Sequence, residues 1–307
     1  MEYPLVSIIT SCFNGEIYLD RYFESILNQT YPHLELIFVN DGSTDQTEKI
    51  ALSYTSKLKE KGISYKYIYQ ENSGQSVALN KGLKIFKGKY LTWPDSDDVM
   101  TDDCIEKKVE FLENHLEYKM VRSNGLFYNE ETNVYRRINE SSNCNKDNIF
   151  EDLLVLKTYG CCGCYMITRD LFLKIYPNRM IYESREGQNW QILVPCSSYS
   201  KCGYIDENLY IIYERNTSHS RKKRSNEEEI KRLEDFKIIL YNAIDNSKCD
   251  KAKYKNIVDF DCARKQFYYA IADRNKKSIK EKYKLMRIHG KVTNEQRFLY
   301  LKHGVLK

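Results

Sequence analysis

Residues 5–45 decide the fold, and they read LVSIITSCFNGEIYLDRYFESILNQTYPHLELIFVNDGSTD. Residues 5–11 are an apolar run rich in β-branched side chains, which predicts a strand buried on both faces. Residues 34–39 predict a second buried strand. Between the two, residues 17–29 bring four apolar side chains onto one helical stripe, namely Leu19, Phe23, Ile26 and Leu27. The order strand, helix, strand predicts a βαβ unit with parallel strands.

The alternation of strand and helix patterns continues to about residue 100. It adds predicted helices at 44–59 and 76–86 and predicted strands at 65–69 and 90–93. An α/β fold with a Rossmann-like, mostly parallel sheet flanked by helices follows from this pattern. Beyond residue 100 the pattern is less regular, and residues 101–226 are interpreted as an α+β half of the same domain. The elements predicted there are helices at 102–115 and 149–156, a weaker helix after Trp190, and strands at 118–128, 134–138 and 204–213.

The distribution of charge and apolar residues separates a third part, residues 227–307. Residues 215–307 carry 25 Lys or Arg against 12 Asp or Glu, whereas the rest of the chain carries 23 against 31. The region reads as helical, with one apolar helix face formed by Leu233, Phe236, Ile239 and Leu240. We therefore expect a basic helical C-terminal module behind a mildly acidic domain, and anionic partners for its surface.

The sequence also favours one cellular compartment. No run approaches the roughly 18 apolar residues that can span a bilayer, and MEYPLVSIITS lacks the features of a signal peptide. A cytoplasmic protein with reduced thiols is therefore expected. Cys161, Cys162 and Cys164 in GCCGCY could form a metal knuckle or could be small residues of a buried strand. Because no second cysteine pair follows at zinc-like spacing, the buried strand is favoured.

Three polar clusters follow predicted strands: SCFNG at 11–15, NDGSTD at 40–45 and DSDD at 95–98. Ligands of open α/β sheets bind beyond the carboxyl ends of the strands. Asp41 could accept a hydrogen bond from a nucleobase, or its side chain could do no more than stabilise the turn that it begins. Asp95 and Asp97 repel each other unless a cation lies between them, and Mg²⁺ or Mn²⁺ shared with a diphosphate suits such carboxylates. Asp98 could instead be stabilised by a helix N-terminus.

Taken together, the motifs resemble those of the family 2 glycosyltransferases. The stretches that carry the resemblance are VSIITSCFN, YLDRYFESILNQTYPHLELIFVNDGSTD, NSGQSVALNKGL and GKYLTWPDSDD. The resemblance is dense from Pro4 to about Met100, thinner to about Ser220 and absent beyond. It implies a GT-A fold in which residues 1–100 bind a nucleotide sugar and residues 101–226 form the acceptor side.

The resemblance also implies roles for individual residues of the donor site. Ser11, Phe13 and Asp41 match positions that hold the uracil. Asp95 matches the carboxylate that faces the ribose and the metal, and Asp97 matches the direct metal ligand of the DXD motif. The positions implied to lie near the nucleoside or sugar are Ser73, Gln75 and Ser96.

The segment YERNTSHSRKKR resembles the part of the family in which a histidine closes on the metal. His219 is the matching residue, and it could otherwise be an exposed histidine without a ligand. The cations around it, Arg215, Arg221 and Lys222, would neutralise the departing diphosphate as part of a flap. A solvated charge run is the alternative for these cations.

The chain departs from the family at the catalytic base. Many inverting relatives carry a Glu-Asp pair at the start of a helix, whereas this chain has Gln188 and Asn189 there. Amides cannot take a proton at neutral pH. We therefore expect Glu186 to act as the base, with Glu183 as the alternative. Gln188, Asn189 and Trp190 would line the acceptor pocket, although Trp190 could instead lie in the core.

The function implied by the resemblance is transfer of a hexose or N-acetylhexosamine from a UDP-sugar to a hydroxyl of a glycan acceptor. The glycan could belong to a polysaccharide, a lipid-linked chain or a glycoprotein, and the reaction would invert the anomeric centre with Mn²⁺ or Mg²⁺ as cofactor. A non-catalytic relative is an alternative, because Gln188 and Asn189 replace the usual acids. A nucleic-acid-binding module would explain the basic tail but not DSDD. A sugar-nucleotide pyrophosphorylase would need a Gly-rich phosphate loop where SCFNG stands.

The partners expected from this function are the UDP-sugar and the glycan acceptor. The C-terminal helices could add a peripheral contact with the inner face of the plasma membrane, since each basic residue near an anionic membrane is worth about 1 kcal/mol. Residues 276–287 are the candidate for that contact. A homo-oligomer interface and a solvated appendage are the alternatives, and nucleic acid is not expected as a partner.

Overall fold

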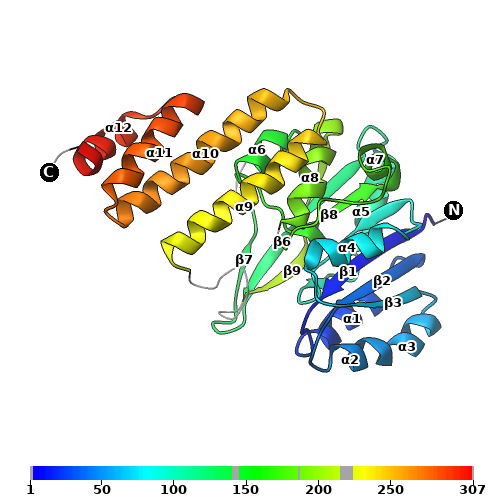
Figure 1. Ribbon diagram of the computed structural model, residues 1–307. Helices are drawn as coiled ribbons and strands as arrows, with labels where there is room; N and C mark the ends of the chain where they lie inside the picture. The colour runs from blue at the N-terminus through cyan, green and yellow to red at the C-terminus, as the bar shows by residue number, and fades with distance from the viewer. Residues whose placement is uncertain (1–2, 140–144, 186, 215–223, 306–307) are drawn as a thin grey trace.

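The protein's fold is known from a computed structural model that describes residues 3–139, 145–185, 187–214 and 224–305 (Figure 1). Within these ranges nine strands form a single sheet, in the order β3-β2-β1-β4-β8-β6-β9-β5, with β7 paired to β6. The strands are β1 Val6–Cys12, β2 Leu34–Asp41, β3 Ser64–Gln70, β4 Tyr90–Thr92, β5 Val99–Met100, β6 Met120–Asn129, β7 Val134–Arg137, β8 Tyr165–Thr168 and β9 Cys202–Glu214.

The sheet is parallel where the sequence predicts βαβ units and mixed beyond them. Strand β1 pairs in parallel with both β2 and β4, and β2 pairs in parallel with β3. Strand β8 then runs antiparallel to β4 and β6, while β9 is parallel to β6 and antiparallel to β5. The expected α/β fold with a parallel sheet is therefore confirmed for the first half, and the second half extends the same sheet.

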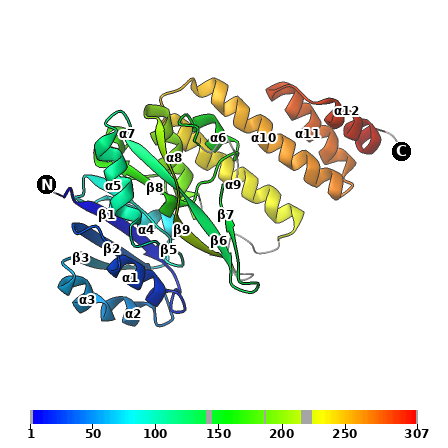
Figure 2. The ribbon, with the colours of Figure 1, turned by 180° about the vertical axis from the view of Figure 1, so that it is seen from behind.

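Helices cover both faces of the sheet, as the apolar runs of β1 and β2 require. Helices α1–α3 lie on one face of the first strands and α4 on the other (Figures 1 and 2). The helices of this half and the next are α1 Leu19–Leu27, α2 Thr47–Ser53, α3 Thr55–Glu60, α4 Gln75–Leu83, α5 Cys104–Asn114, α6 Phe150–Leu154, α7 Arg169–Ile175 and α8 Gln188–Tyr199.

The C-terminal helices extend away from strands β1–β3 (Figure 2). They are α9 Asn226–Asp245, α10 Lys251–Ala272, α11 Lys276–His289 and α12 Asn294–Tyr300, followed by a π-helical turn at Leu301–Val305. Leu240 and Ile244 of α9 belong to the main core of the protein. From Ala263 onward the helices build a second core of their own, whose buried members include Phe267, Ile279 and Met286.

Several local features differ from the sequence expectation. The helix predicted at 44–59 is two short helices, α2 and α3, which meet at Tyr54. The run GCCGCY forms a buried 3₁₀ turn, Cys162–Cys164, before β8 rather than strand alone. Strand β5 and helix α7 carry no clear periodic signal in the sequence. Within the described residues, no helix is both long enough and apolar enough to cross a membrane.

Candidate donor site

The residues predicted for the donor site lie at one edge of the sheet. Strands β2, β1 and β4 are neighbours, so the residues that follow each of them come together. Ser11 is the penultimate residue of β1, and Asp41 ends β2. Asp95 follows β4 by three residues. Phe13 exposes 53% of its surface just beyond β1, which leaves its ring open to a ligand.

Asp41 is buried at the end of β2, and its carboxylate accepts three hydrogen bonds. Gln70 Nε2 and the backbone N–H of Ser73 donate to Oδ1 over 2.7 and 2.9 Å, and the N–H of Gly74 donates to Oδ2 over 3.0 Å. An ionised carboxylate offers about four acceptor positions. The side chain is therefore fixed in orientation and can still accept one more donor, such as a ring N–H.

Side chains fix the loop after β1 to the loop after β2. The N–H of Asn14 donates to Ser43 Oγ over 2.9 Å, and the N–H of Gly15 donates to Thr47 Oγ1 over 2.8 Å. In return, Asn14 Oδ1 accepts from the N–H of Thr44 over 2.9 Å. This mutual bonding makes the two strand-end loops one rigid unit on which Phe13 is carried.

Asp95 is bonded at both carboxylate oxygens. Gln75 Nε2 donates to Oδ1 over 2.9 Å, and the Cys162 thiol donates to Oδ2 over 3.2 Å. The backbone N–H of Asp95 donates to the Tyr210 hydroxyl over 3.1 Å. Burial raises the pKa of Asp95, while the bonds from Cys162 and Gln75 oppose that rise. Residues from α4 and the 3₁₀ turn thus orient the carboxylate, while Tyr210 of β9 holds the backbone of Asp95.

Asp97 and Asp98 share the same crowded environment. Burial raises the pKa of Asp97 to about 6, the charge of Asp95 adds to the rise, and Arg21 opposes it. Burial, followed by the charges of Asp97 and Asp95, raises the pKa of Asp98 well above its usual range. Asp98 Oδ1 accepts from the N–H of Tyr213 over 3.1 Å, which ties this segment to β9. A cation would relieve the repulsion among the three carboxylates.

The burial of Asp97, together with the nearby charge of Asp95, predicts that Asp97→Asn stabilises the ligand-free protein at pH 7.5. The pKa of Asp97 is about 6 in the fold against 3.8 as the reference, so the folded state binds the proton more tightly than the unfolded state. The free energy of unfolding therefore falls as pH rises from about 4 to about 6. Above that range the ionised side chain costs about 1–3 kcal/mol.

Thermal unfolding in chelator measures this effect. The melting temperature of Asp97→Asn should exceed that of the wild type at pH 7.5, and the difference should vanish near pH 4. Asp102→Asn, at an exposed aspartate a few residues on, should leave the melting temperature unchanged. An unchanged or lower melting temperature for Asp97→Asn at pH 7.5 would show that the charge costs nothing there.

The side chains of the acidic cluster are chemically suited to bind a hard divalent cation. Asp95 and Asp97 offer carboxylate oxygens, the ligands that Mg²⁺ and Mn²⁺ take. Among the described residues, no group of three or more His, Cys, Asp or Glu is arranged to hold a metal ion. His219, Arg215, Arg221 and Lys222 lie outside the described residues. A cation here would thus complete its coordination with groups other than the described side chains.

The segment before α8 lies across the start of α4. Asn80 Nδ2 donates to the Ile181 carbonyl over 3.0 Å, and the Ser76 and Ser184 hydroxyls are 3.1 Å apart. Gly74 has a φ of +97°, and a Cβ there would lie 3.2 Å from Arg185 Cα. The chain that carries Glu183 and leads to α8 is therefore packed against the loop that binds Asp41.

The residues predicted for the acceptor pocket fall into different environments. Asn189 Oδ1 accepts from Trp93 Nε1 over 3.1 Å, so it lies beside the end of β4. Gln188 is buried at the first position of α8. Trp190 packs on Gly160, where a Cβ would lie 1.5 Å from its ring, and contacts Phe236 of α9 with ring centroids 6.1 Å apart. These are the contacts of a side chain packed in the core, which was the alternative left open for Trp190.

Of the two residues predicted as base, the structure describes Glu183 and not Glu186. Glu183 is exposed on the segment before α8. Glu186 lies outside the described residues, so its role stays a prediction.

Cys162 and Arg21 are among the partners of the acidic cluster that sequence reasoning missed. Cys162 contacts Asp95 because β8, which follows it, lies next to β4 in the sheet. Arg21 of α1 donates to the Asp97 carbonyl over 2.8 Å and to Glu130 over the same distance. No local pattern marks either residue, since both contacts join segments at least 60 residues apart. For Cys162, the cysteine-rich run GCCGCY was the available signal in the sequence.

The chain belongs to glycosyl transferase family 2. The sequence model of that family matches residues 7–176, more than half of the chain. The match includes the three strand-end clusters described above.

Bacterial relatives are similar over little more than a third of the chain. An uncharacterised glycosyltransferase of Rickettsia prowazekii, RP339, is 47% identical over 118 residues, which cover 38% of this chain and 35% of that protein. The putative teichuronic acid biosynthesis glycosyltransferase TuaG of Bacillus subtilis is 43% identical over 109 residues, covering 36% of this chain and 42% of TuaG. The matched region is thus less than half of either relative.

Two solved structures are similar over nearly the whole chain. Residues 1–349 of TarS from S. aureus, in complex with UDP-GlcNAc, superpose with a TM-score of 0.62 at 17% identity, covering 97% of this chain and 79% of that one. The mannosyltransferase PcManGT of Pyrobaculum calidifontis, in complex with GDP-Man and Mn²⁺, gives 0.55 at 15% identity, covering 98% and 80%. These likenesses confirm the expected GT-A fold.

Proposed function

We propose that the protein transfers a hexose or N-acetylhexosamine from a UDP-sugar to a hydroxyl of a glycan acceptor, with Mn²⁺ or Mg²⁺ as cofactor. The observation that carries the proposal is that Asp41 and Asp95 lie at or just beyond the ends of the two strands that flank β1 and are both bonded by residues 73–75. Asp41 accepts from the N–H groups of Ser73 and Gly74, and Asp95 accepts from Gln75. TarS with bound UDP-GlcNAc and PcManGT with bound Mn²⁺ support the donor class and the cofactor. Metal-dependent release of UDP from a UDP-sugar tests it.

In the proposed donor complex, the chain's own residues bind and orient the nucleotide. Asp41 accepts the ring N–H of uracil, and Phe13 covers the base. Ser11, Ser73, Gln75 and Ser96 surround the nucleoside and sugar. Asp95, held by Gln75 and Cys162, faces the ribose and the ion. Asp97 ligates the ion, with His219 as a further ligand. When bound, the cation supplies positive charge to the diphosphate as it leaves.

The proposed transfer is a single displacement. The acceptor oxygen bonds to the anomeric carbon while the bond from that carbon to the diphosphate oxygen breaks. The acceptor proton passes to a carboxylate, for which Glu186 is proposed and Glu183 is the alternative. Arg215, Arg221 and Lys222 would neutralise the UDP that departs. Gln188, Asn189 and Trp190 would shape the acceptor side, of which Asn189 lies nearest to β4 through Trp93.

A single displacement predicts inversion at the anomeric carbon. An α-linked UDP-sugar should give a β-glycoside, because the acceptor oxygen attacks from the face opposite the diphosphate. The ¹H NMR coupling constant of the anomeric proton in the first product measures the outcome for a gluco-configured sugar. An α-linked product would contradict the single displacement.

Beyond the donor, the proposed partner is the glycan acceptor, and the teichuronic acid role in the name of TuaG supports a bacterial surface polymer as its class. The excess of basic residues supports two proposals for the C-terminal helices. They could contact an anionic membrane, or they could form a homo-oligomer interface. Liposome co-sedimentation at low and high salt tests the first, and light scattering tests the second.

A further inference from the structure

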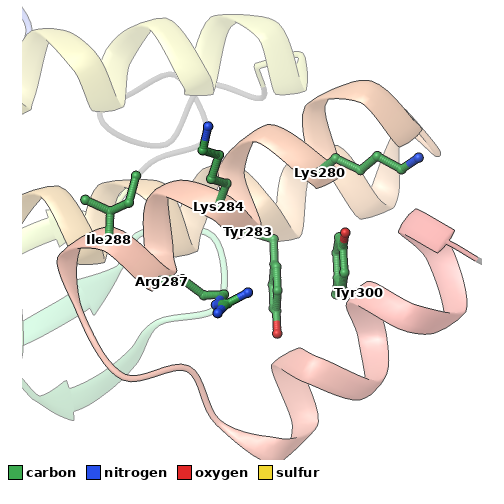
Figure 3. Close-up of a pocket in the computed structure, with 6 residues that line it drawn as sticks. All are labelled: Lys280, Tyr283, Lys284, Arg287, Ile288 and Tyr300. Carbon is green, nitrogen blue, oxygen red and sulfur yellow. The ribbon is translucent and has the colours of Figure 1, made fainter.

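The helices at the C-terminal end enclose a groove that the donor site does not use. Its cavity has a volume of about 330 Å³ and lies between α11 and α12 (Figure 3). The residues that line it are Lys280, Tyr283, Lys284, Arg287, Ile288 and Tyr300. Small-molecule clefts in proteins have volumes of about 300–1,000 Å³. The groove is thus large enough for a ligand.

Two tyrosine rings form one wall of the groove. The rings of Tyr283 and Tyr300 are parallel within 4°, with centroids 3.9 Å apart. Tyr283 also contacts Phe267 of the second core, with centroids 6.0 Å apart, so the pair is anchored to a packed interior. Neither tyrosine hydroxyl has a hydrogen-bond partner among the residues that the structure describes. Both hydroxyls can therefore donate to or accept from a ligand.

Three cations form the rest of the polar lining. Lys280, Lys284 and Arg287 are exposed, and none of them forms an ion pair within the described part of the chain. Their spacing of four and three residues puts them on one side of α11. No carboxylate lines the groove, and the one acid of α11, Glu281, pairs with Lys282. The concentration of positive charge in a hollow favours an anionic ligand.

The combination of these groups identifies the ligand class. Cations bind carboxylate or phosphate groups, free hydroxyls bond to sugar hydroxyls, and the exposed side chain of Ile288 offers apolar contact to a sugar ring. The inner faces of the two rings are occupied by each other, which leaves less surface for stacked nucleobases.

We propose that this groove binds a segment of an anionic glycan, and that this glycan is the acceptor of the transfer. The second part rests on the function proposed above. The groove lies at the end of the molecule opposite to α1–α3, with α9 and α10 between it and the sheet (Figures 1 and 2). Only a polymer can occupy such a site while its end lies at the donor site. A second site on the same chain raises the effective concentration of the acceptor end.

Calorimetric titration of the full chain with an oligogalacturonate, a chain of uronic acids, tests the binding. A neutral dextran oligosaccharide of the same length is the reference ligand. The wild type should bind the oligogalacturonate and not the dextran. The double variant Lys284→Gln/Arg287→Gln should lose about 10-fold or more in affinity, because two charge-assisted contacts are removed.

The matched control is Lys49→Gln/Lys59→Gln, which removes two exposed cations on α2 and α3, at the opposite end of the molecule from the groove (Figure 1). It should change the affinity by less than about 2-fold, as expected for distant, screened charges. Equal losses in both double variants, or equal binding of dextran, would overturn the proposal. The proposal would also be overturned if Lys284→Gln/Arg287→Gln lost affinity only for phosphatidylglycerol vesicles, because the groove would then be a membrane site. A loss of affinity only for a single-stranded oligonucleotide would overturn it in the same way.

UDP release by the wild type without any glycan reports on the donor site separately. If UDP release occurs and oligogalacturonate does not bind, the groove proposal fails and the proposed function stands. If the oligogalacturonate binds with the predicted variant pattern and no UDP-sugar is turned over, the proposed function fails and the binding site stands.

Discussion

Replacing Asp97 by alanine should abolish sugar transfer and remove the metal dependence of UDP binding. The reason is that Asp97 is the proposed direct ligand of the ion that carries the diphosphate charge. The carboxylate is partly buried and lies close enough to Asp95 for that charge to raise its pKa. One preorganised contact that stabilises charge on a leaving group raises the rate by about 10²–10³-fold. Loss of the ion itself should lower the rate by more than this.

The measurement pairs turnover with calorimetric titration of UDP, with and without Mn²⁺. Asp97→Ala should give the same weak UDP affinity in both conditions, whereas the wild type should bind more tightly with Mn²⁺. Asp102→Ala, at an exposed aspartate just beyond the cluster, should behave as the wild type. The fold of Asp97→Ala should be intact, since removing a buried charge relieves repulsion. Full activity in this variant would refute the assigned role.

The second large effect concerns the base. If Glu186 takes the acceptor proton, Glu186→Gln should lower kcat by about 10²-fold or more. The amide keeps the size and hydrogen-bonding capacity of the side chain but cannot accept a proton at neutral pH. Binding of the donor should be nearly unchanged, because Asp41 and the acidic cluster are untouched. Loss in kcat with constant donor KM is the signature of an interaction made only in the transition state.

Glu183→Gln is the matched comparison, since it makes the same change three residues earlier on the same segment. If the loss follows Glu183 instead, the base is Glu183. Near-wild-type rates in both variants would mean that the base lies on another segment. In that case the correspondence drawn between Gln188-Asn189 and the Glu-Asp pair of other family members is wrong.

The sequence predicted the parallel half of the fold because both faces of its strands are covered. Strands such as β1 and β2 must then be apolar throughout, and this leaves a signal in the sequence. The same reasoning predicted that Asp41 and Asp95 follow strands of one parallel sheet, and in the structure these strands, β2 and β4, flank β1. The break between α2 and α3 was not predictable in this way, since Tyr54 at the junction is held by the distant Asp20 and Glu24.

The supporting contacts of the site depend on long-range pairing, which local patterns do not encode. Cys162 meets Asp95 only because β8 inserts between β4 and β6. The packing of Trp190 depends on Gly160 and on Phe236 of α9. The groove between α11 and α12 depends on a stacked pair of tyrosines 17 residues apart. In each case the residue types were visible in the sequence, and their juxtaposition was not.

The most direct test of the central claim is UDP release by the wild-type protein from a panel of UDP-sugars in the presence of Mn²⁺. Without an acceptor, water can take its place slowly, so the assay does not require the glycan to be known. The proposed function predicts UDP release from at least one UDP-hexose or UDP-N-acetylhexosamine, with loss of the signal in chelator and its recovery when Mn²⁺ is returned. No release from any UDP-sugar, together with no metal-dependent binding of UDP, would contradict a UDP-sugar donor site built on Asp41, Asp95 and Asp97.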